Sequence, residues 1–150
     1  MMATLILMVG FIGLIEAVTV ASNAMDHARR QSLAAQILAH YTEELYLASW
    51  STISNLSTST TSLTIDSQFN AARQALGDDL TTGAVVRFTL SRYATNPDPL
   101  TNFREINFTV TWVVKTSRRD SSGNQVSFTF SRSTTAWYGK YGLPLSFRQS

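Results

Sequence analysis

The chain has 150 residues, of which 44% are apolar and 15% are Asp, Glu, Lys or Arg, whereas about 25% of a typical soluble domain is charged. This length suits one core of ordinary size with one appendage and excludes a many-domain enzyme. The absence of cysteine excludes disulfide frameworks, zinc–cysteine sites, thiol catalysis and iron–sulfur clusters, and a net charge of +2 gives no argument for nucleic-acid binding.

The first 25 residues are almost free of charge. The stretch from Met1 to Met25 holds one ionisable side chain, Glu16, and the stretch from Met1 to Ile15 holds none. About 20 mostly apolar residues can span a bilayer as a helix, although a glutamate near one end costs a few kcal/mol. We therefore expect residues 1–25 to form a membrane anchor that is later buried among copies of the same chain.

Two other interpretations of this apolar run fit less well. A cleavable secretory signal would carry a basic stretch before its apolar core, and the sequence has none there. A core helix of a soluble protein would need apolar neighbours on every face, which the remaining residues can hardly supply.

Helix-forming residues continue after the apolar run. Between Ala28 and Trp50 there is no Gly or Pro, and apolar residues recur in steps of three and four, so they share one face: Leu33, Ala34, Ile37, Leu38, Tyr41, Leu45 and Ala48. We predict one continuous helix of about 50 residues, roughly 75 Å long. Gly10 and Gly13 are its interior helix breakers, and we expect the helix to loosen there in an assembled filament.

A hydroxyl-rich connection and a short helix are expected next. Residues 54–62 (SNLSTSTTS) predict an exposed loop, either a plain connector or a surface decorated with O-linked sugar. In residues 66–76 (DSQFNAARQAL), Asp66 is an N-cap candidate, apolar residues recur at helical spacing, and Gly77 follows.

Beyond Gly83 the hydrophobic period changes from about 3.6 to 2. Apolar and polar residues alternate in residues 84–93, 106–114 and 125–133, which predicts three one-sided strands. Short connections, including a hairpin loop at residues 118–124, favour an antiparallel meander. The aromatic tail is expected to wrap the sheet as an irregular arm, with an aromatic contact surface as the alternative.

These elements predict an α+β fold in which a long protruding N-terminal α-helix packs on a three- to four-stranded antiparallel β-sheet. The expected parts are the apolar helix 1–25 and a globular domain 26–150, with an amphipathic helix 26–50, a loop with a short helix 51–82, the sheet 83–136 and a C-terminal arm 137–150. The expected helix–sheet core is Leu33, Ile37, Tyr41, Leu45, Phe88, Phe108, Trp112, Phe128 and Phe130.

No sequence pattern indicates catalysis or metal binding. His27 and His40 lie on the predicted helix without a set of further ligands, and Glu44 beside His40 is more simply a solvated residue. Nucleophile-elbow, Walker, dinucleotide-binding and HExxH motifs are missing. The turn at Asp120 offers too few carboxylates for Ca²⁺. We expect no enzymatic activity, no cofactor and no specific nucleic acid, with these arginines paired or facing solvent: Arg87, Arg92, Arg104, Arg118, Arg119 and Arg132.

The order of these parts resembles the type IV pilin superfamily, which includes pilus subunits and the pseudopilins of type II secretion. MMATLILMVGFIGLIEAV is similar to the stretch that in this family follows the processed Phe-Thr-Leu-x-Glu box, and QSLAAQILAHYTEELYLASW resembles an LA-x-x-x-LE pattern that ends in tryptophan. The box itself is absent, and residues 10–16 only imitate it. We expect the chain to start a few residues inside the mature subunit or to have a shortened start. The usual C-terminal cysteine pair is missing too.

The resemblance implies a structural subunit that resides in the inner membrane and then joins an extracellular helical filament on the bacterial cell surface. Its expected partners are identical subunits and pilus or secretion assembly machinery. The alternatives are a minor pilin or type II secretion pseudopilin, and a monomeric membrane-anchored periplasmic binding domain. We expect Glu16 to make a polar contact between subunits, and the filament-core helix to present Met1, Leu5, Ile6, Leu7, Met8, Val9, Phe11, Ile12, Leu14, Ile15 and Val18.

Overall fold

The computed structural model describes residues 2–78, 86–97 and 102–141, apart from the side chains of residues 2–7, 9 and 116–118. The chain divides into two compact units, Met1–Ser32 and Leu33–Ser150. Residues 26–32 fall within the first of these two units.

Helix α1 (Met2–Leu47) runs without interruption through Gly10 and Gly13. It ends before Trp50 because Ser49 begins a separate helix, α2 (Trp50–Ser54), by accepting a hydrogen bond from the Thr52 backbone N–H. The Tyr138 hydroxyl donates to the Ala48 carbonyl at this break. The prediction of one helix through residue 50 is therefore wrong at its end. In the part of the chain that the structure describes, no helix is both long enough and apolar enough to cross a membrane.

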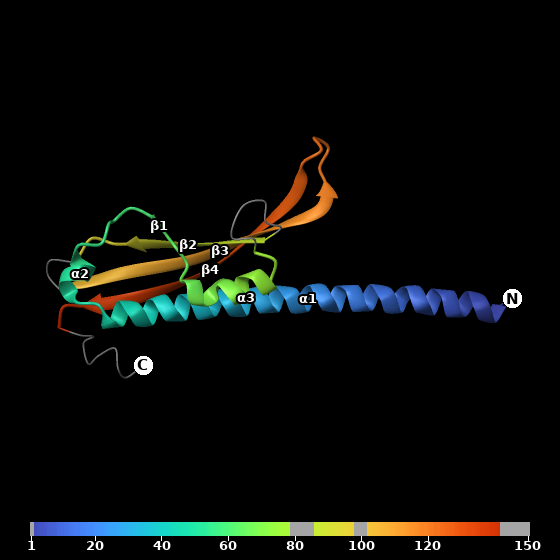
Figure 1. Ribbon diagram of the computed structural model, residues 1–150, viewed down its shortest axis with the longest axis horizontal. Coiled ribbons are helices and arrows are strands. Elements are labelled where there is room, and N and C mark those ends of the chain that lie inside the picture. The colour runs from blue at the N-terminus through green and yellow to red at the C-terminus, as the bar shows by residue number, and fades with distance from the viewer. Residues whose placement is uncertain (1, 79–85, 98–101, 142–150) are drawn as a thin grey trace. The chain divides into compact units, whose positions relative to one another are not determined.

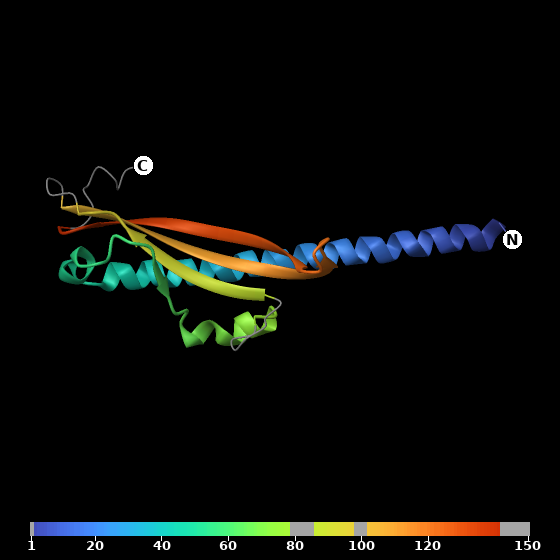
Figure 2. The same ribbon diagram turned by 90° about the horizontal axis from the view of Figure 1, so that it is seen from above.

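Four antiparallel strands form one sheet in the order β1–β2–β3–β4, as Figure 1 shows. The strands are β1 (Thr61–Leu63), β2 (Val86–Ala94), β3 (Phe103–Arg119) and β4 (Gln125–Gly139). The C-terminal part of α1 lies along one face of this sheet in both views (Figures 1 and 2). The predicted α+β fold, a long N-terminal helix packed on an antiparallel sheet, is confirmed.

Two strand boundaries differ from the sequence analysis. Strand β1 begins in the segment that was expected to be a loop, because Thr61 pairs with Arg92 and lengthens the sheet beyond β2. Strand β4 reaches Gly139, so Trp137 belongs to the sheet and not to an irregular arm, since Glu105 of β3 pairs with it. The predicted arm otherwise falls mostly on residues 142–150, which lie outside the described residues.

The short helix forms where it was predicted, as the 3-10 turn η1 (Ser67–Phe69) followed by α3 (Asn70–Ala75). Asp66 caps it by accepting a hydrogen bond of 3.0 Å from the Gln68 N–H. Gly77 follows with φ of +84°, a left-handed conformation in which a side chain is strained.

The core lies between the C-terminal part of α1 and the inner face of the sheet. Of the residues expected there, these are buried: Leu33, Ile37, Leu45, Phe88, Phe108 and Trp112. Tyr41 and Phe130 are partly buried against this cluster. Phe128 is 54% exposed, contrary to expectation, because it lies on the edge strand in the last row that spans β2, β3 and β4. A strand with a neighbour on one side only leaves its outermost side chains in water.

Candidate functional site

The N-terminal unit carries a broad surface of large apolar side chains. At 100° per residue, most of these side chains fall within about 160° of the helix circumference, and we call this surface the large face. Met8, Phe11, Ile12 and Ile15 line a shallow apolar depression on it. Their exposure in the single chain runs from 56% for Ile15 to 71% for Met8. The large face consists of Met8, Phe11, Ile12, Leu14, Ile15, Val18 and Met25.

The opposite side of the same helix segment is lined mostly by small residues, with the exposed Val20 at its edge. Gly10, Gly13, Ala17, Ala21 and Ala24 fall within about 80° of arc, and we call this surface the small face. A Cβ atom built at Gly10 or Gly13 meets nothing within 4 Å. Packing within the chain therefore does not require glycine at either position. A helix surface without bulk allows another helix to approach its backbone closely.

Glu16 lies at the margin between these two faces. It is exposed and makes no hydrogen bond or ion pair with any described residue. The neighbouring polar side chain Thr19 is satisfied within the helix, because its hydroxyl donates to the Ile15 carbonyl at 2.9 Å. Among the expected filament-core residues, the side chains of Met1, Leu5, Ile6, Leu7 and Val9 lie outside the described part of the chain.

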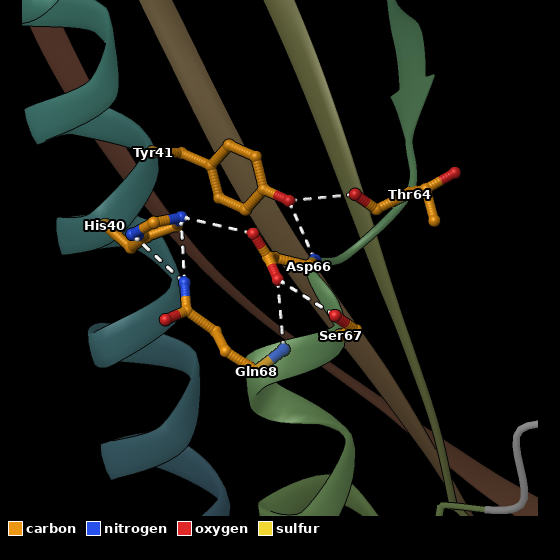
Figure 3. A network of polar contacts seen from close by, with 6 residues as sticks. All are labelled: His40, Tyr41, Thr64, Asp66, Ser67 and Gln68. Atoms are coloured by element: carbon orange, nitrogen blue, oxygen red, sulfur yellow. Dashed lines mark hydrogen bonds and ion pairs between the residues drawn. The ribbon is translucent and has the colours of Figure 1, made fainter.

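A polar network joins α1 to the segment that leads into η1 (Figure 3). The Tyr41 hydroxyl donates to the Thr64 carbonyl at 2.8 Å and accepts from the Asp66 N–H at 3.0 Å. The Gln68 amide nitrogen lies 3.0 Å from His40 Nε2, and Asp66 Oδ2 lies 3.9 Å from the same atom. Burial raises the pKa of Tyr41, with the negative charges of Asp66 and Glu44 acting in the same direction.

This network has the geometry of a structural clasp rather than of a catalytic site. The Ser67 hydroxyl is 3.4 Å from Asp66 Oδ1, so serine and histidine are not arranged as in a Ser–His–Asp triad. The His40 ring instead meets the ring of Phe69 edge to face at 5.5 Å between centroids. In the described residues, no group of three or more His, Asp or Glu side chains is placed to hold a metal ion.

Arg104 departs most from the sequence-based expectation, because it is buried and does not face solvent. Its side chain is 1% exposed, and its guanidinium donates to the carbonyls of Thr95, Ile53 and Leu56. Burial lowers the pKa of Arg104, and the positive charge of Arg92 lowers it further. Arg104 thus fastens α2 to the sheet. The alternation of β3 assigned residue 104 to the inner face, but residue type argued against burial.

A second internal pair was not expected either. Asp78 is buried, and its Oδ2 atom accepts a hydrogen bond of 2.7 Å from Arg73 Nε of α3. The same oxygen lies 3.4 Å from the Phe88 backbone nitrogen. This ion pair links α3 to the turn that follows it and to strand β2, so its role is structural.

The structure therefore contains two kinds of candidate site. One is the pair of faces on the N-terminal helix segment, and the other is the set of polar contacts within the globular unit. The small face is visible in the spacing of the glycines and alanines, although helix loosening was the only role expected of Gly10 and Gly13. Comparison of this chain with protein-family models, with curated proteins and with solved structures finds no match.

Proposed function

We propose that the chain is the structural subunit of a homopolymeric helical filament of the type IV pilus kind, which assembles through residues 8–25 of α1. The observation that carries this proposal is the pair of unlike, uncharged faces on one helix segment. A surface helix of a globular protein has one apolar stripe and an opposite polar face. Here the side opposite the large face is made mostly of small residues, Gly10, Gly13, Ala17, Ala21 and Ala24, with Val20 at its edge.

Exposure of the large face argues for a partner. Soluble monomers rarely expose a large contiguous apolar patch, and where such a patch occurs it usually marks an interaction site. Burial of apolar surface contributes about 25 cal/mol per Å², so several side chains such as Phe11 and Ile15 supply a substantial driving force before the entropy of assembly is deducted.

The unlike faces favour copies of the same chain as the partner. The large side chains of one copy fit the space left by the small residues of the next copy. When this contact repeats from copy to copy, both faces of every inner copy are covered. A two-fold dimer would join like faces and leave one of the two surfaces exposed. A head-to-tail contact that does not close into a ring generates an open helical filament.

The position of Glu16 is compatible with this packing. A buried carboxylate without a partner is strongly destabilising, whereas one at a margin can reach water or a donor on a neighbouring copy. We therefore keep the proposal that Glu16 makes a polar contact with a neighbouring subunit.

Electron microscopy of the purified full-length chain after detergent removal tests the proposal. The wild type should form fibres of uniform width. Gly13→Leu should abolish them, because the leucine fills the small face, while the chain stays folded since Gly13 has open space around it. Ala39→Leu, a similar size change at an exposed position of α1 outside residues 8–25, is the matched control and should assemble. Monodisperse particles from the wild type would overturn the proposal.

A membrane stage before assembly stays a separate proposal. It rests on the uncharged run from Met1 to Ile15, part of which lies outside the described side chains. Extraction from host membranes by detergent but not by alkaline carbonate would support it, and release by carbonate would contradict it.

A further inference from the structure

The outer face of the sheet, which points away from α1, carries an ordered array of uncharged polar side chains. Alternation along β2 buries Val86, Phe88 and Leu90 and exposes the residues between them. The strand register then aligns the outward residues of β2, β3 and β4 into three rows: Thr89–Thr111–Ser131, Ser91–Thr109–Ser133 and Tyr93–Asn107–Thr135.

Two exposed aromatic residues lie at one end of this array. Tyr93 is 46% exposed in the third row, and Trp137 is 52% exposed two residues beyond Thr135 on β4. Strands lie about 4.8 Å apart and outward residues about 6.8 Å apart, which separates the two Cα atoms by about 12 Å. This distance is close to the length of a disaccharide.

The polar groups between the two rings are held in place. The Asn107 amide donates to the Thr135 hydroxyl at 3.1 Å, and its carbonyl oxygen accepts from the Thr109 hydroxyl at 3.0 Å. Such a chain of hydrogen bonds keeps an amide and two hydroxyls fixed at the surface. They can exchange hydrogen bonds with a ligand that has both donors and acceptors.

The chemistry of the face selects the class of ligand. The three rows carry no formal charge at neutral pH, and the two charged residues that flank them on the same face, Glu105 opposite Trp137 and Arg87 next to the first row, have opposite signs. A face without net positive charge disfavours nucleic acid and anionic lipid, because both are bound through Lys and Arg. Exposed aromatic rings offer apolar faces with a polar tip. A neutral sugar chain has the complementary pattern, since its C–H faces stack on aromatic rings and its hydroxyls pair with Ser, Thr and Asn.

We propose that this outer face binds a neutral polysaccharide chain laid across Tyr93 and Trp137. Tyr93 and Trp137 supply the stacking platforms, and Asn107 with the neighbouring Ser and Thr hydroxyls orients the sugar. The site lies in the globular unit and uses none of the residues of the large or small face, so it does not depend on filament assembly.

Co-sedimentation of the full chain with insoluble cellulose and with chitin at low centrifugal force tests the site. The wild type should be retained on at least one of them. Trp137→Ala and Tyr93→Ala should each weaken retention about tenfold, because each removes a stacking ring. Trp137→Phe should keep most of it. Tyr141→Ala removes a ring that is 83% exposed but lies outside the three rows, and should bind as the wild type does.

Titration with cellohexaose and chitohexaose gives a second readout in solution. Trp137 emission should change on binding, and the change should be missing in Trp137→Phe, which retains the other two tryptophans. Failure of the wild type to bind either polymer, or equal binding by the Tyr93→Ala/Trp137→Ala double variant, would overturn the proposal. If the double variant instead impairs fibre formation and the wild type ignores sugar, the face belongs to a subunit contact and the proposal fails.

Discussion

Arg104 on β3 donates a hydrogen bond to the carbonyl of Ile53 in α2, across about 50 residues of chain. The same guanidinium reaches the Leu56 and Thr95 carbonyls, so one buried cation binds carbonyls from two separate segments, the C-terminal end of α2 and the residue after β2. The last carbonyls of a helix lack their usual N–H partner within the helix. The Ile53 carbonyl also accepts a hydrogen bond of 3.2 Å from the Leu56 N–H, and Arg104 adds a charged donor to it.

Replacing Arg104 by Met should destabilise the globular unit by about 2–4 kcal/mol, since one buried and two partly buried carbonyls lose a charged donor. Chemical denaturation followed by circular dichroism measures this. Arg132→Met, at an exposed position on β4, should change the free energy of unfolding by less than about 0.5 kcal/mol. Equal effects of the two substitutions would contradict the clamp role of Arg104.

The clasp at Tyr41 predicts a pH-dependent contribution to stability. Burial raises the pKa of Tyr41, so the folded chain binds the phenolic proton more tightly than the unfolded chain does. The contribution is fully present below about pH 10, the pKa of an unperturbed tyrosine, and is lost as the pH rises above it. Denaturation of wild type and Tyr41→Phe between pH 7 and 11 should give a stability difference that shrinks with pH. A constant difference would rule this out.

Phe88 and Phe128 form a matched pair for the core. Phe88 is buried and stacks on Trp112 with 5.9 Å between ring centroids, whereas Phe128 is half exposed on the edge strand. Phe88→Ala should therefore cost about 3–5 kcal/mol, and Phe128→Ala should cost about 1 kcal/mol or less. Thermal unfolding measures both losses. A larger loss for Phe128→Ala than for Phe88→Ala would contradict the position of the core described above.

Hydrophobic periodicity predicted the fold well, because the C-terminal part of α1 and the strands each bury one face and expose the other. The spacing of Leu33, Ile37 and Leu45 and the alternation around Phe88 and Trp112 reflect burial directly, and these residues are buried. Periodicity does not report which strand lies at an edge, and therefore Phe128 was misplaced. It also does not report that a charged residue at an inward position finds carbonyl partners from distant segments, as Arg104 does.

Short elements were harder to predict for a different reason. Strand β1 has three residues of hydroxyl-rich sequence and forms through pairing with β2, so its cause lies far along the chain. The end of α1 depends on the Ser49 cap and on Tyr138, and tertiary contacts of this kind override helix propensity. The candidate assembly surface, in contrast, is local to one helix and was predictable in both its large and its small residues.

Head-to-tail packing of α1 can be tested most directly by cysteine cross-linking, because the chain contains no cysteine of its own. Ile15→Cys marks the large face and Ala17→Cys marks the small face, with Ala21→Cys and Ala24→Cys as alternative small-face positions for an unknown axial offset. After mild oxidation of assembled material, a variant that carries one cysteine on each face should give a ladder of dimers, trimers and longer oligomers in non-reducing gels, while each single-cysteine variant should stay monomeric. Efficient dimers from a single-cysteine variant, without a ladder from any double variant, would contradict the packing of unlike faces.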